Sequence, residues 1–152
     1  MIVSIAQAGA RRLDEVMEVM RSAFGDHYGE AWTRPQCAGI LPMDGVTLLI
    51  ADGGSDLLGF ALYRTILQDA ELLLLAVAPT AQGKGIGRKL LGHFIDDAKK
   101  NGASKIHLEV RDGNPAARIY EAAGFAPAGR RRDYYRGAGG RQYDAITFIL
   151  GA

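Results

Sequence analysis

The chain has 152 residues, of which 48% are hydrophobic and 23% charged, and its formal net charge is +1 at pH 7. This length and composition are typical of one globular domain with a sizeable core, so we expect a single domain over residues 1–152. A net charge this small gives no support for general binding to nucleic acid. No apolar run approaches the ~18 residues that a membrane span needs, and the start of the chain lacks the pattern of a secretory signal. We therefore expect a cytoplasmic protein without membrane partners.

The chain has one cysteine, Cys37, which excludes an intrachain disulfide and any multi-cysteine metal site. A lone cysteine of this kind is most often a buried small hydrophobe. His27 and His93 have no partner at metal-ligand spacing, so we expect no metal site.

The first part of the chain predicts a strand and two helices. Apolar residues within 2–5 suggest a short first strand. Helical spacing of apolar residues predicts a helix over 13–24 that ends at Gly25. The segment T-R-P-Q at 33–36 has the form of a capping box, which predicts a short helix running to residue 40 or 41.

The middle of the chain predicts a hairpin and then a strand, a glycine loop and a helix. Strand patterns at 46–51 and 57–67 close around D-G-G-S at 52–55. The apolar run at 71–78 predicts the next strand. An amphipathic helix follows the loop Q-G-K-G-I-G-R at 82–88 and ends at N-G, residues 101–102.

The last third predicts a strand, a helix and a hairpin. Residues 105–110 alternate, with Ile106, Leu108 and Val110 on one face and Lys105, His107 and Glu109 on the other. A helix begins at Pro115 and closes at Gly124, and a final hairpin pairs 125–135 with 143–150 across a glycine-rich turn. The whole pattern predicts an α/β fold with a mixed, twisted sheet of about seven strands flanked by about four helices.

The glycine loop at 82–88 is the strongest functional feature of the sequence. A loop of this kind leaves backbone N–H groups unpaired at the positive end of a helix, which favours an anion such as phosphate. Lys84 and Arg88 add positive charge beside it. The P-loop pattern does not fit, because no Ser or Thr follows Lys84 or Lys89, and the dinucleotide fingerprint fails because Leu90 stands at its third glycine. The alternative is a glycine-rich turn that merely packs closely.

The pattern Q-x-x-G-x-G behind L-A-V-A-P at 75–79 resembles the acetyl-CoA site of the GNAT superfamily of N-acetyltransferases. Three further segments resemble its ribosomal-protein-alanine N-acetyltransferase branch, the RimI type. These are E-V-R-D-G-N with Y-E-A-A-G-F at 109–125, R-D-Y-Y at 132–135 with D-A at 144–145, and A-W-T at 31–33. The similarity covers nearly the whole chain and is weak before Leu57. One departure is the spacing of six residues from Asn114 to Tyr120, where the branch usually has seven.

The resemblance implies a GNAT-like fold and acetyl-CoA as co-substrate, with no metal. In that family the loop amides hold the CoA diphosphate, and the preceding strand pairs with the pantetheine arm. The implied cofactor-binding residues are Leu75, Ala76, Val77, Gln82, Gly83, Lys84, Gly85, Ile86, Gly87, Arg88, Asn114 and Ala117.

The resemblance also implies two catalytic residues for direct transfer of acetyl to an amine. Glu109 matches the family's proposed base, which would accept a proton, often through water, and Tyr120 matches the acid that would protonate the leaving thiolate. The alternatives are an ion pair of Glu109 with Lys105 or His107, and a Tyr120 ring that packs beneath Phe125. His107 is itself an alternative base, since histidine titrates near neutral pH.

The chemistry of the acceptor favours an N-terminal amine. At pH 7 roughly a tenth of α-amino groups are neutral, against well under a thousandth of lysine side chains. Trp32, Tyr134 and Tyr135 resemble the residues that wall the peptide groove of the RimI-type branch, with ordinary aromatic packing as the alternative. An arginine-rich hairpin could contact an acidic protein or ribosomal RNA, or be merely solvated; it contains Arg130, Arg131, Arg132, Arg136 and Arg141.

The sequence therefore predicts an acetyl-CoA-dependent N-acetyltransferase acting on a protein N-terminal amine, with the N-terminal alanine of a ribosomal protein as a candidate. Two alternatives stay open for the acceptor: a small-molecule amine and a lysine side chain. A non-catalytic acyl-CoA-binding module is the alternative of another class, and RNA binding through the hairpin is a third.

Overall fold

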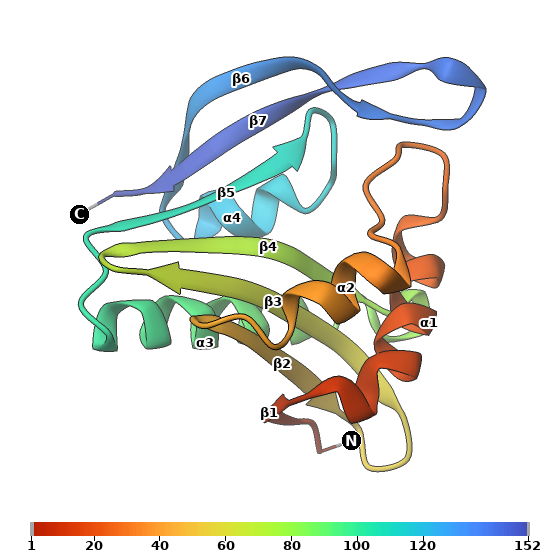
Figure 1. The fold of residues 1–152 in the computed structure, drawn as a ribbon, viewed down its shortest axis with the longest axis vertical. Coiled ribbons are helices and arrows are strands. Elements are labelled where there is room, and N and C mark those ends of the chain that lie inside the picture. Colours follow the sequence, from red (N-terminus) through yellow and green to blue (C-terminus); the bar gives the residue numbers. More distant parts are fainter. Residues whose placement is uncertain (1, 152) are drawn as a thin grey trace.

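The computed structural model describes residues 2–151, which form a seven-stranded sheet of order β1-β2-β3-β4-β5-β7-β6 with helices on both faces (Figure 1). Neighbouring strands are antiparallel except β4 and β5, which are parallel. The prediction of a mixed sheet with seven strands and four α-helices is confirmed. The strands are β1 (Ser4–Ala8), β2 (Val46–Asp52), β3 (Leu57–Ile66), β4 (Asp69–Val77), β5 (Lys105–Arg111), β6 (Phe125–Arg136) and β7 (Gln142–Leu150). The helices are α1 (Leu13–Phe24), α2 (Arg34–Ile40), α3 (Ile86–Lys100) and α4 (Ala117–Ala122).

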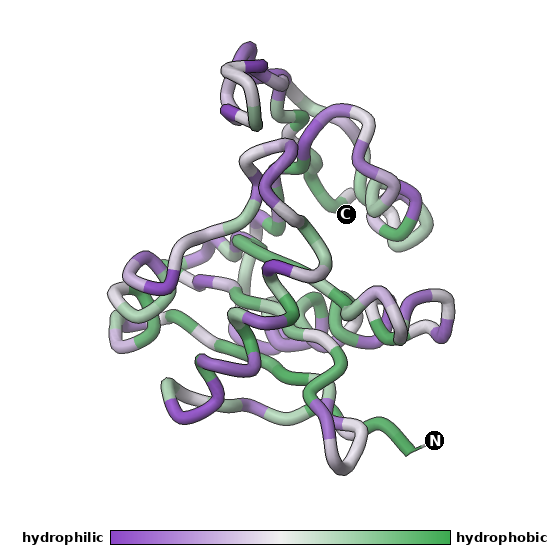
Figure 2. Tube along the Cα trace, turned by 90° about the vertical axis from the view of Figure 1, so that its right-hand side faces the viewer, coloured by the Kyte–Doolittle hydropathy of each residue, from purple (hydrophilic) through white to green (hydrophobic). Residues whose placement is uncertain are grey.

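Each face of the sheet carries its own apolar core. On one face, Leu90 and Phe94 of α3 pack against Tyr63 of β3. On the other, Val16 and Met20 of α1 pack with the sheet, and Cys37 of α2 is buried there as the small hydrophobe that the sequence predicts. In Figure 2 hydrophobic stretches run through the middle of the molecule, while hydrophilic ones gather in the outer turns. None of the helices within residues 2–151 is long and apolar enough to cross a membrane.

Local signals place the helices well. The helix over 13–24 ends at Gly25, whose φ is 60°. The capping box at the start of α2 is present, with the Thr33 hydroxyl accepting from the Gln36 N–H and the Gln36 side chain accepting from the Thr33 N–H. The helix α3 ends at Lys100, two residues before Gly102, whose φ is 81°.

Three predicted boundaries are wrong. β1 spans Ser4–Ala8 rather than residues 2–5, because an edge strand takes its position from pairing, and here Ser4 pairs with Asp52 of β2. β4 begins at Asp69 rather than residue 71, in a tight hairpin with β3. The last helix, α4, begins at Ala117 rather than Pro115, since the chain first makes a turn at Asn114.

The strands β4 and β5 separate soon after they meet. Their parallel pairing runs only from Asp69 with Lys105 to Leu72 with Leu108. Beyond that point β5 pairs with β7 and β4 with β3. A bulge at Leu73 accompanies the separation, since Leu72 pairs with Tyr63 but Leu74 pairs with Leu62. The bulge changes which residues face which core: Leu72 lies in the α3 core, whereas Leu74 lies in the α1 core.

A hydrogen bond of the buried Tyr63 joins β3 to α3, and its removal by substitution tests how much this contact stabilises the fold. Its hydroxyl donates to Asp97 Oδ2 of α3 at 2.6 Å, and burial, then this bond, raises the pKa of the phenol. We expect Tyr63→Phe to lower the free energy of unfolding by about 1–2 kcal/mol at pH 7.5, because the Asp97 carboxylate loses its buried donor. Urea unfolding measures this change.

The same substitution has a signature at high pH. A tyrosine in the unfolded chain ionises near pH 10, while the folded Tyr63 stays protonated, so its contribution is lost as the pH rises above about 10. The stability of Tyr63→Phe should therefore fall less steeply than that of the wild type between pH 9.5 and 11. Tyr134→Phe, at a side chain that is 50% exposed, is the matched control. Equal slopes for the wild type and Tyr63→Phe would contradict the assignment.

Candidate active site

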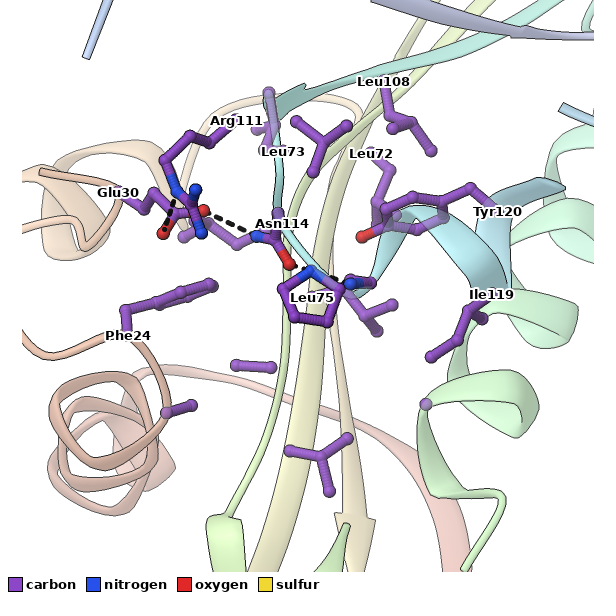
Figure 3. Close-up of a pocket in the computed structure, with 18 of the residues that line it drawn as sticks. Phe24, Glu30, Leu72, Leu73, Leu75, Leu108, Arg111, Asn114, Ile119 and Tyr120 are labelled. Atoms are coloured by element: carbon purple, nitrogen blue, oxygen red, sulfur yellow. Dashed lines mark hydrogen bonds and ion pairs between the residues drawn. The ribbon is translucent and has the colours of Figure 1, made fainter. Parts of the chain in front are cut away.

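The separation of β4 and β5 opens a cavity of about 790 Å³. The cavity runs from the glycine loop at the start of α3, along β4, to α4 and to the loop between α1 and α2. Figure 3 shows its central part, with Leu75 of β4 between Glu30 and Arg111 on one side and Tyr120 on the other. Residues from four separate stretches of sequence therefore meet in one hollow.

The glycine loop forms one end of the cavity. Gly83 and Gly85 both have φ of 80°, and Gly85 caps α3 in the left-handed conformation. The first backbone bond of the helix runs from the Lys89 N–H to the Gly85 carbonyl at 3.1 Å, so the preceding amides at residues 86–88 have no partner within the helix. Gln82 donates its side-chain amide to the Val77 carbonyl at 3.0 Å, which ties the loop to the end of β4. The result is a cradle of free amides that fits a diphosphate.

The close packing of α3 beneath this cradle explains Gly87. A Cβ at Gly87 would lie 3.3 Å from Ile119 Cδ1 of α4 and 3.6 Å from Val77 Cγ2 of β4. A side chain here would therefore require Ile119 to give way by a few tenths of an ångström, while the distance to Val77 is an ordinary contact. The close contact at Gly87 is of the kind that the alternative of a close-packed turn predicts, while the anion site stays a prediction.

The outer edge of β4 forms the floor of the cavity. Residues 73–77 line it, and in the described part of the chain this edge pairs with no strand after Leu72. An unpaired strand edge offers N–H and C=O groups to an extended ligand that carries amides. Among the predicted cofactor-binding residues, all line the cavity except Lys84 and Ala117, and Ala117 is replaced there by its neighbour Ala116.

Tyr120 lies at the centre of the cavity wall. Its side chain is buried, with the ring 6.2 Å from that of Phe125 and 6.4 Å from that of Phe148. The hydroxyl end points across the cavity toward Asn114 (Figure 3). Tyr120 thus packs beneath Phe125 and lines the cavity at the same time. Burial raises the pKa of Tyr120, with smaller contributions from Tyr135 and Glu30, so the phenol is protonated at neutral pH.

Glu109 also lines the cavity, from β5. Its Oε2 pairs with Arg131 Nε at 2.8 Å and accepts from the Thr147 hydroxyl at 3.4 Å. The expected alternatives, ion pairs with Lys105 or His107, are wrong: His107 pairs with Asp69 of β4 at 2.6 Å. His107 is absent from the cavity lining within residues 2–151, which removes the support for it as a base.

Trp32, Tyr134 and Tyr135 line the outer part of the cavity. The two tyrosines follow an irregularity in β6, where Asp133 has φ of 53° and its N–H donates to Asp144 Oδ1 at 2.9 Å. This backbone bond, followed by the bond from Arg130, lowers the pKa of Asp144. The charged Asp144 thus holds the bend that presents both tyrosines to the cavity, a physical reason for the R-D-Y-Y and D-A pattern.

A buried network surrounds Glu30, in the loop between α1 and α2, and the sequence analysis did not predict it. Glu30 Oε1 accepts from Arg111 Nε at 3.1 Å, and Glu30 Oε2 accepts from Asn114 Nδ2 at 2.6 Å (Figure 3). The Arg111 guanidinium lies 3.5 Å from the centre of the Tyr28 ring. Asn114 Oδ1 accepts from the Ala116 N–H, so both ends of this amide bind the protein itself. Glu30 and Arg111 are 81 residues apart, and no local pattern links them.

Comparisons with known proteins agree with this geometry. The family model of the Acetyltransferase (GNAT) family matches residues 13–125. The [ribosomal protein bS18]-alanine N-acetyltransferase of Escherichia coli K12 is 45% identical over 92 residues, which are 60% of this chain and 62% of that protein. The protein of the same name from Haemophilus ducreyi is 32% identical over 126 residues, 76% of this chain and 87% of its own.

Among solved structures, the ribosomal-protein-S18-alanine N-acetyltransferase from Escherichia coli matches with a TM-score of 0.87 and 30% identity. The match covers 98% of this chain and 93% of that chain. The E. coli K12 sequence match spans only about three fifths of that relative, whereas the structural match extends over nearly the whole fold. Because the family model alone covers most of the sequence, the chain belongs to the GNAT family of acetyltransferases.

Proposed function

We propose that this chain is an acetyl-CoA-dependent N-acetyltransferase that acts on a protein N-terminal α-amino group. The observation that carries the proposal is the continuous cavity between the glycine loop and the aromatic side chains Trp32 and Tyr135. Tyr120 and Glu109 line the same cavity. A co-substrate held by the glycine loop and an amine held by the aromatic side chains would thus share one cavity with both titratable groups.

The residues present fit acetyl-CoA as co-substrate, which supplies an activated thioester carbonyl when bound. The amides at residues 86–88 and the positive end of α3 would hold the diphosphate, with Arg88 beside them. The free edge of β4 at residues 73–77 would pair with the amides of the pantetheine arm. Lys84 lies outside the cavity lining, so its part would be limited to long-range attraction.

The proposed reaction forms a C–N bond and breaks a C–S bond. The α-ammonium group first loses a proton, which Glu109 accepts directly or through water. The free amine nitrogen then attacks the thioester carbonyl, and Tyr120 donates its phenolic proton to the departing sulfur. The nitrogen gives up its second proton, which restores Tyr120 through solvent, so one proton is released overall. The raised pKa of Tyr120 keeps this donor protonated over the neutral range.

The acceptor is proposed from the relatives and from the chemistry. The curated relatives are named for the alanine of ribosomal protein bS18, and we infer the same class of acceptor, an N-terminal alanine, for this chain. An α-amine also needs less help to lose its proton than a lysine side chain. The aromatic residues at the outer part of the cavity can pack on the first side chains of a peptide.

Tyr120→Phe tests whether the cavity is catalytic. We expect kcat for an alanine-initiated peptide to fall roughly 10²-fold or more, because the leaving sulfur loses its proton donor. Release of free CoA thiol and mass spectrometry of the peptide measure the reaction. Glu109→Gln should lower kcat as well, whereas Glu121→Gln, at an exposed position of α4 outside the cavity lining, should change it little.

The same assay separates the alternatives. Acetylation of polyamines or lysine side chains but of no N-terminal peptide would overturn the proposed acceptor. A non-catalytic module would bind CoA, release no thiol, and be indifferent to both Tyr120→Phe and Glu109→Gln.

Gly85→Ala tests the diphosphate cradle. A side chain at a φ of 80° costs roughly 1–2 kcal/mol in the left-handed region, so the first turn of α3 should shift away from its present course. We expect calorimetry to show roughly tenfold weaker CoA binding, or more. Gly92→Ala, in the same helix with open space around its Cβ, should leave CoA affinity unchanged and stabilise the fold by about 0.5–1 kcal/mol. Equal CoA affinity in the two variants would remove the glycine loop from the site.

A further inference from the structure

We propose that the Glu30 carboxylate forms the subsite that receives the α-ammonium group of the acceptor. The inference rests on the proposed function and adds a residue that the sequence did not indicate. Glu30 belongs neither to the glycine loop nor to the pair Glu109 and Tyr120, yet it lines the same cavity.

The first support is the way the carboxylate is fixed. The Glu30 side chain is only 10% exposed, and its two oxygens are held by separate donors, Arg111 Nε and Asn114 Nδ2. A carboxylate has about four acceptor positions, so these two bonds leave acceptor capacity on both oxygens. Figure 3 shows the group at the wall of the cavity, with its position set from two sides. An ammonium group, which carries three donors, can use the remaining positions.

The second support is the covering of the positive partner. The Arg111 guanidinium is only 9% exposed. It also donates to the Asp112 carbonyl at 3.1 Å, and it stacks on the Tyr28 ring. The guanidinium is therefore held by the protein on several sides. Glu30 and Arg111 both line the cavity, so an ammonium group would bind the carboxylate at the oxygen positions that Arg111 and Asn114 leave open.

The third support is the effect of the Glu30 charge on its neighbours. Burial is the first cause that raises the pKa values of both Tyr120 and Tyr135, and the negative charge of Glu30 adds to it at both, while Arg111 acts in the opposite direction at Tyr135. These phenols lie in the wall where the acceptor nitrogen would have to come. The same charge that disfavours a phenolate here favours an ammonium ion, and a buried site strengthens both effects.

Glu109 is less suited to this binding role. Its Oε2 already pairs with Arg131, whose side chain is 61% exposed, and accepts from Thr147. Glu30 has an arginine partner as well, so the difference lies in how each carboxylate is held: separate donors fix the two oxygens of Glu30, whereas both bonds of Glu109 are made by Oε2 alone. The two acidic residues thus divide the work: Glu30 holds the ammonium group in place, and Glu109 takes the proton.

The test compares two ligands that differ only in charge. One is an alanine-initiated peptide, and the other is its desamino analogue, which has hydrogen in place of the ammonium group. With CoA bound, the wild type should bind the amine peptide roughly tenfold or more tightly than the analogue. In Glu30→Gln the ratio of the affinities for the amine peptide and its analogue should fall toward one. KM for the peptide should rise roughly 10–100-fold, and kcat should stay within about threefold. The ratio of affinities does not depend on the fraction of folded protein.

Glu121→Gln is the matched control, because it removes an equal charge from an exposed position of α4 outside the cavity lining. It should keep the full preference. A preference that is unchanged in Glu30→Gln overturns the inference, as does an equal loss of affinity for both ligands, which would show that Glu30 only shapes the loop.

A second measurement needs no variant. A crystal structure of the wild type with CoA and the amine peptide should place the terminal nitrogen within hydrogen-bond distance of the Glu30 carboxylate. A nitrogen bound elsewhere would overturn the inference even if Glu30→Gln did not fold. If the wild type acetylates no peptide at all, the proposed function itself fails, and the thiol-release assay distinguishes that result from a failure of the Glu30 subsite alone.

Discussion

The parallel pairing of β4 with β5 stops at Leu72 and Leu108, and the whole site depends on this early separation. A continued ladder would have closed the sheet and satisfied the backbone groups of residues 73–77 within the protein. Instead, β5 turns to β7, and the bulge at Leu73 lets the rest of β4 pack on α1 while its edge stays free. Unpaired backbone groups are costly when they are buried without partners. Here they face a cavity, where water or a ligand can satisfy them, so the gap in the sheet is compatible with a stable fold.

The features that the sequence predicted are those whose causes are local. The capping box of α2, the glycine loop and the alternation of β5 each depend on residues a few positions apart, and the structure has all three. The position of β1 could not be read in this way, since an edge strand is placed by its partner β2. The partners of Glu109 and His107 were mispredicted for the same reason: the nearest charges in sequence are not the nearest in space, and Arg131 and Asp69 come from other strands. The role of Glu30 could not be predicted, because the sequence around a charged loop residue does not show that it pairs with a buried arginine elsewhere in the chain.

The chain between Asn114 and Tyr120 makes a tight turn before α4. The Asn114 N–H donates to the Arg111 carbonyl, and the Asn114 carbonyl accepts from the Ala117 N–H. Its side chain then caps the same turn by accepting from Ala116. Tyr120 lies buried in the cavity wall with this spacing. The side-chain amide of Asn114 is committed to Glu30 and Ala116.

The loop that carries Glu30 and the hairpin that carries Tyr135 are held together by their backbones. The His27 carbonyl accepts from the Ala138 N–H at 2.9 Å, and the Tyr28 ring meets the Tyr143 ring edge-on with their centres 5.0 Å apart. A Cβ at Gly29 would overlap the Arg136 carbonyl, and one at Gly137 would overlap the His27 carbonyl, so only glycine permits this approach. These contacts join the segment that carries Glu30 to the segment that carries Tyr135. They therefore set the spacing between the group that would hold the amine and the side chains that would pack on its peptide.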